Sequence, residues 1–109
     1  MAYDEALADR VRDALARRGG LTEIKMFGGI GFMLNGNMCC GVAKDELMVR
    51  VGPDGYEEAV MLPDARPMDF TGRPMFGFVF VDRQGVEEAH ALQQWVERGV
   101  SFAESLPAK

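Results

Sequence analysis

The sequence predicts an α+β fold in which about five antiparallel strands form one sheet and helices pack mainly on one of its faces. Three observations lead to this class: apolar residues at helical spacing near both ends of the chain, several short apolar runs between them, and connections too short for crossover helices. With 109 residues, 48% hydrophobic and 27% charged, the chain has the size and composition of one globular domain spanning residues 1–109.

The first helix is expected to begin after Asp4, a candidate N-cap, and to end at Gly19-Gly20. Its apolar stripe consists of Leu7, Val11, Ala14 and Leu15. Such a stripe indicates a helix that buries one face. Residues 21–25 follow either as a transition or as a short strand.

The clearest local signal is Asn35-Gly36, a favoured two-residue turn between apolar runs at 30–34 and 38–43. A second tight connection leads to residues 47–51, which alternate in the manner of a strand. These three runs predict an antiparallel meander.

After the meander, a short helix is expected over residues 56–61, with Asp54 as its candidate cap and Pro63 as its stop. Residues 66–70 can form a short strand, in which Pro67 suits an edge or a strand start.

The next run, residues 75–81, predicts a strand that is apolar on both faces and therefore central in the sheet. On one of its faces Phe76, Phe78 and Phe80 are expected in a row. A long helix over residues 86–102 then closes the core. The predicted order is thus α-β-β-β-α-β-β-α.

The charge of the chain limits its partners. Its formal net charge is −5, so the averaged field repels phosphate backbones and anionic membranes, and nucleic-acid binding by this domain alone is disfavoured. No window approaches the length of a membrane span, and the first residues carry no targeting signal. We therefore expect a cytoplasmic protein.

Residues with catalytic or metal-binding chemistry are few. Cys39 and Cys40 are adjacent, so on a strand they would point to opposite faces and would not form a disulfide. His90 is the only histidine, which leaves too few ligands for a structural zinc site. The sequence has no serine-centred turn motif to go with this one histidine, so it suggests no catalytic triad. We expect no cofactor, no metal and no enzymatic activity.

Gly28 and Gly29 allow a second interpretation. Glycines let backbone N–H groups approach an anion, but here they lead into a strand and hairpin, which favours a turn or bulge. Arg50 and Arg73 could lie close to this turn and form an anion-binding site with it, unless Arg73 simply pairs with Asp69 or caps backbone carbonyls.

The row Phe76, Phe78 and Phe80 is the main candidate for a binding surface. In the simpler interpretation helices bury this face of the sheet. In the alternative, the row is covered by a protein partner or by a second copy in a homodimer, because exposed apolar patches on small proteins mark interfaces.

Several segments together resemble the TfoX N-terminal domain family. The resemblance covers this chain from about Tyr3 to Phe102. The residues that carry it are Lys25-Met26-Phe27-Gly28-Gly29, Gly31-Phe32, Asn35-Gly36, Leu47 to Val51, Pro67-Met68-Asp69-Phe70-Thr71-Gly72-Arg73-Pro74-Met75 and Trp95-Val96.

The resemblance implies the element order described above, in a fold similar to that of secretion chaperones, and it implies no catalytic residue. It also implies a regulatory or protein-binding role of the kind found in a small single-domain relative of the competence regulator.

Overall fold

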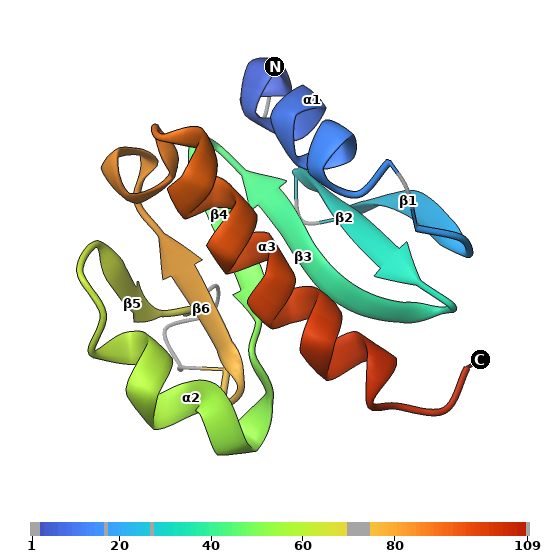
Figure 1. Ribbon diagram of the computed structural model, residues 1–109. Helices are drawn as coiled ribbons and strands as arrows, with labels where there is room; N and C mark the ends of the chain where they lie inside the picture. Colours follow the sequence, from blue (N-terminus) through green and yellow to red (C-terminus); the bar gives the residue numbers. More distant parts are fainter. Residues whose placement is uncertain (1–2, 17, 27, 70–74, 109) are drawn as a thin grey trace.

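The computed structural model describes residues 3–16, 18–26, 28–69 and 75–108, which form a six-stranded antiparallel sheet with its helices on one face (Figure 1). The elements in chain order are α1 (Glu5–Ala14), β1 (Leu21–Met26), β2 (Gly29–Leu34), β3 (Asn37–Ala43), β4 (Glu46–Arg50), α2 (Gly52–Val60), β5 (Ala65–Pro67), β6 (Phe78–Val81), the 3-10 helix η1 (Arg83–Val86) and α3 (Ala89–Glu104). Across the sheet the strands run β1-β2-β3-β4-β6-β5.

This architecture confirms the predicted α+β class and element order. The sheet has one strand more than expected because residues 21–25, for which the sequence allows a transition or a short strand, belong to β1, which pairs with β2 along its whole length.

The start of α1 follows its sequence signal, but the helix ends at Ala14, earlier than the predicted end at Gly19-Gly20. Asp4 caps the helix, since its carboxylate accepts a hydrogen bond from the Leu7 N–H at 3.1 Å. The Asp4 N–H donates to the carbonyl of Lys44 at 2.6 Å, which ties the start of α1 to the turn between β3 and β4. Leu7, Val11 and Leu15 are buried, as their spacing predicts.

The tight turns are set by left-handed backbone conformations. Asn35 (φ 53°) and Gly36 (φ 84°) join β2 to β3, which confirms the predicted Asn-Gly hairpin. The sequence suggested Asp54 as the cap of α2, but Asp54 is not the cap. The helix begins earlier, at Gly52, with Pro53 in its first turn and no side-chain cap bond, so Asp54 lies inside the first turn.

The main core lies between the sheet and the helices. In Figure 1, α3 crosses the sheet in front of β3 and β4, with α1 beside it. Leu92, Val96 and Val100 of α3 pack here with Val49, Val79 and other inward-facing strand residues. The approach is close: a Cβ on Gly99 would lie 2.1 Å from the carbonyl oxygen of Cys39.

A second, smaller core occupies the other face of the sheet. It consists of Met38, Ala43, Met48, Met68 and Phe80, with Met33 and Phe78 at its border. The expectation that helices bury the phenylalanine side of β6 is therefore wrong. Val79 and Val81 face the helices, and the alternation of strand side chains places Phe78 and Phe80 on the opposite face with the methionines.

Candidate binding groove

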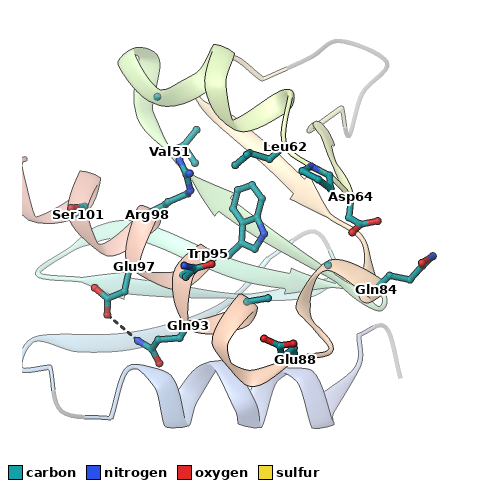
Figure 2. A pocket seen from close by; sticks show the side chains of 15 residues that line it. Val51, Leu62, Asp64, Gln84, Glu88, Gln93, Trp95, Glu97, Arg98 and Ser101 are labelled. Carbon is teal, nitrogen blue, oxygen red and sulfur yellow. Dashed lines mark hydrogen bonds between the residues drawn. The ribbon is translucent and has the colours of Figure 1, made fainter.

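A groove of about 950 Å³ lies between α2 and α3, on the helix side of the sheet. Figure 2 shows the indole of Trp95 projecting from α3 into this space, with Leu62 and Val51 near it. Leu62 follows the end of α2, while Val51 precedes it. The groove thus combines an aromatic side chain with aliphatic ones, a composition typical of recognition sites.

One ion pair joins the two helices. The guanidinium carbon of Arg98, which lines the groove, lies 5.5 Å from the centroid of the Trp95 ring. Arg98 also donates a hydrogen bond to Glu58 of α2 at 3.0 Å. Because Trp95 is only 7% exposed, a ligand would contact only a small part of the indole.

The charges along the groove are mostly negative. Among the described residues that line it, Asp64, Glu88 and Glu97 are acidic and only Arg98 is basic. Glu97 is already engaged, since it pairs with Arg18 and accepts a hydrogen bond from Gln93 at 3.0 Å. Within the described part of the chain, Asp64 and Glu88 make no ion pair. Two carboxylates in the groove are thus available to a cationic group.

The three phenylalanines predicted as a surface do not form one. Phe80 is 5% exposed and belongs to the second core, and Phe78 is half-buried at its border. Phe76 lies outside β6, is 64% exposed, and packs against Tyr56 of α2 with ring centroids 4.7 Å apart. The row is broken at Gly77, whose φ of 92° interrupts the extended chain before β6 begins.

The described candidates for anion binding, Gly28, Gly29 and Arg50, are likewise not brought together. Gly28 (φ 74°) is in the turn before β2, and Gly29 starts β2 beside Ala43. Ala43 pairs with Glu46 at the start of β4, whereas Arg50 is at the other end of this strand. At the usual rise per residue, Arg50 is about 13 Å from Glu46 along the strand. Arg73 falls outside the described residues.

Gly29 and Arg50 each have structural surroundings of their own. A Cβ on Gly29 would lie 2.2 Å from the Val42 carbonyl oxygen, so glycine permits the close approach of β2 to β3. The guanidinium carbon of Arg50 is 5.6 Å from the Phe78 ring centroid and 5.1 Å from that of Phe102.

Cys39 and Cys40 face the same way, contrary to the expectation from strand alternation. A register shift between Phe32 and Met33 leaves Cys39 as an extra residue in β3, and this bulge turns both thiols into the main core. Their sulfur atoms are 3.8 Å apart, and both cysteines are free thiols. Hydrogen bonding between them lowers the pKa of Cys39, whereas the same bond and burial raise that of Cys40.

Other candidate chemistry is sparse over the ranges that the structure describes. They hold no group of three or more His, Cys, Asp and Glu side chains that could bind a metal ion. His90 is exposed on α3. None of the described helices has the length and apolar character needed to cross a membrane.

Sequence reasoning did not find the groove. Trp95 falls within the helix expected over residues 86–102, where its spacing fits an apolar stripe. Leu62 and Asp64 lie between α2 and β5, and Glu88 precedes α3, so no local pattern links them to Trp95. The one local signal is the arginine at position 98, one helical turn after the tryptophan, where the two side chains are neighbours.

The model of the TfoX N-terminal domain family matches residues 13–103. No curated protein and no solved structure matches the chain significantly. The family match covers most of the chain, including every described strand and all of α3 except its last residue. The protein therefore belongs to the TfoX N-terminal domain family.

Proposed function

We propose that this domain is a non-enzymatic, regulatory protein-interaction module that holds a segment of a partner protein in the groove between α2 and α3. The observation that carries the proposal is the groove itself, with Trp95 beside aliphatic side chains and polar groups at its rim. Recognition sites combine these features, since apolar area supplies affinity and a few polar groups fix orientation.

The chemistry of the groove indicates the kind of segment that fits. Apolar side chains would pack on Trp95 and Leu62, and a lysine or arginine beside them would pair with Asp64 and Glu88. The net charge of −5 supports a basic amphipathic partner and disfavours nucleic acid. The two free cysteines in the core are in keeping with the reducing conditions of a cytoplasm.

Trp95 provides the readout, because it is the only tryptophan in the chain. The probe is a helical peptide of leucine and lysine with one apolar and one basic face, and its counterpart replaces every lysine with glutamate. We expect saturable changes in tryptophan emission with the basic peptide, weakened by added salt, and none with the acidic one.

Glu88→Lys should lower the affinity for the basic peptide about five- to tenfold, because it converts an attraction in the groove into a repulsion. Asp45→Lys is the matched control, since it makes the same charge change at an exposed position in the turn between β3 and β4. Equal losses for both variants would mean that only net charge matters. That result, or an unchanged emission with the basic peptide, would contradict the proposal.

A further inference from the structure

The two edges of the sheet are built differently. At one edge, β5 has three residues and includes Pro67, and short strands and prolines are the usual means of preventing edge-to-edge association. At the other edge, β1 has six residues, contains no proline, and pairs with β2 without a bulge. Figure 1 shows no described segment beyond β1 on that side. One long edge is therefore left open.

The ladder between β1 and β2 shows which backbone groups face this open edge. The Asn35 N–H donates to the Gly20 carbonyl at 2.9 Å, one position before β1. Since antiparallel pairs alternate between hydrogen-bonded and non-hydrogen-bonded, Thr22 and Ile24 bond to β2. The N–H and C=O groups of Leu21, Glu23 and Lys25 then point away from the sheet.

The side chains of β1 follow the same alternation. Glu23 lies opposite Phe32 on the helix face, where Arg12 holds its two carboxylate oxygens at 2.6 and 2.8 Å. Lys25 shares this face, is exposed, and makes no ion pair with any described residue. Ile24 lies on the opposite face and is 44% exposed.

We propose that β1 is a homodimerisation edge, where the β1 strands of two copies pair antiparallel about a two-fold axis at Ile24. In this register Glu23 lies directly opposite Lys25 of the second copy, and Lys25 opposite its Glu23. Both positions have outward-facing backbone groups, so each pair exchanges both of its N–H···O bonds. The two Ile24 side chains meet in the non-hydrogen-bonded position between these pairs.

A second copy fits this edge because β1 is complementary to itself. Glu23 and Lys25 lie on the same face of β1, one residue to either side of the axis at Ile24. On dimerisation each of them faces the opposite charge of the second copy, which gives two opposite-charge pairs. The axis runs perpendicular to the sheet, so the helices of both copies stay on one face of a continuous sheet. The proposal is independent of the groove, which is lined by α2 and α3 and does not include any residue of β1.

The first test is the mass of the full chain by sedimentation equilibrium, from low micromolar to near-millimolar concentration. We expect a concentration-dependent dimer. Lys25→Glu places like charges opposite each other twice and should raise the dissociation constant at least about tenfold. Lys44→Glu, the same charge change in the turn between β3 and β4, should leave it unchanged.

A second pair of variants separates backbone pairing from charge. Lys25→Pro removes an outward N–H that β2 does not use, so the monomer should stay folded by circular dichroism while the dimer is lost. Lys25→Gln keeps the N–H and should weaken the dimer only modestly. A dimer that survives both Lys25→Glu and Lys25→Pro would overturn the proposal.

Hydrogen exchange by NMR tests the register in the unmodified protein. As the concentration rises, the amides of Glu23 and Lys25 should become protected, while those of Thr22 and Ile24, already bonded to β2, should not change. A chain that stays monomeric at the highest concentration would overturn the proposal, as would a dimer without this alternating protection.

Discussion

At the scale of single residues, most ion pairs among the described residues join different segments of the fold. Arg12 joins α1 to β1 through Glu23, and Arg66 of β5 contacts Glu46 of β4 and, at 2.8 Å, Asp82 after β6. Hydrogen bonds from these arginines lower the pKa of both glutamates. The pKa of Asp82 is raised, first by its hydrogen bonding with Glu46.

The Arg12–Glu23 pair should make folding stability depend on pH. The folded-state pKa of Glu23 is below its usual value, so its contribution is present above about pH 4.3, the pKa of an unfolded glutamate, and disappears as the pH falls through the folded-state value. At low protein concentration, urea unfolding of Glu23→Gln should therefore show a weaker loss of stability in acid than the wild type. The difference should be below about 1 kcal/mol, because the pair is partly exposed.

Salt supplies the control for this prediction. In about 1 M salt the screening length falls to about 3 Å, and the two pH profiles should converge. Parallel profiles at low salt would show that the ion pair does not contribute to stability.

Residue-level predictions succeeded where the signal is local. Asp4 and Asn35-Gly36 were recognised because a cap and a two-residue turn depend on only a few adjacent residues. The orientation of Cys39 and Cys40 was predicted wrongly, because a bulge depends on how β3 pairs with β2 and not on either strand alone.

At the scale of elements, the contact between α3 and β3 depends on a glycine inside a helix. Gly99 leaves no room for a Cβ beside the Cys39 carbonyl, whereas a Cβ on Gly55 of α2 would meet only the Val51 Cβ, at 3.8 Å. The same substitution should therefore have opposite effects in the two helices.

Gly55→Ala should raise the free energy of unfolding by about 0.5–1 kcal/mol, because alanine favours the helix and restricts the unfolded chain. Gly99→Ala should lower it by about 1–3 kcal/mol, because α3 must move away from the sheet. Urea denaturation of the two variants beside the wild type measures both changes. Stabilisation by Gly99→Ala would mean that α3 does not sit this close to β3.

Element boundaries were harder to predict than element types. The sequence does not settle whether residues 21–25 form a strand, because three of the six residues of β1 are polar and its apolar pattern is weak. Phe76 was assigned to a strand, but β6 begins only at Phe78, after the left-handed backbone of Gly77. Neither outcome can be read from periodicity, since both depend on pairing partners.

At the scale of the whole molecule, both faces of the sheet are covered by packed side chains. Helices cover one face, and methionines with Phe80 form the second core on the other. As a result, methionines in this chain differ widely in exposure: Met48 is 1% exposed and Met68 2%, against 83% for Met61.

Mild oxidation with hydrogen peroxide should distinguish these methionines. We expect Met61 to form its sulfoxide first and Met48 and Met68 to stay reduced until the protein is unfolded in urea, as followed by peptide mass spectrometry. Oxidation of Met48 in the native state as fast as that of Met61 would show that the second core is open to solvent.

The groove and the β1 edge involve different parts of the fold. The groove is lined by α2, α3 and the segments around β5 and η1, whereas β1 is at the opposite end of the sheet from β5. A dimer through β1 would therefore leave one groove on each copy accessible.

The sequence by itself determined the class of fold, the order of helices and strands, the Asn-Gly hairpin and the family. These properties follow from periodicity, caps and turns, which act over a few residues and survive without knowledge of neighbours. The tertiary structure decided which sheet face the helices cover, how the two cysteines point, that Gly28 and Arg50 are far apart, and that Trp95 lines a groove. Each of these depends on contacts between residues distant in the chain, which local patterns do not encode.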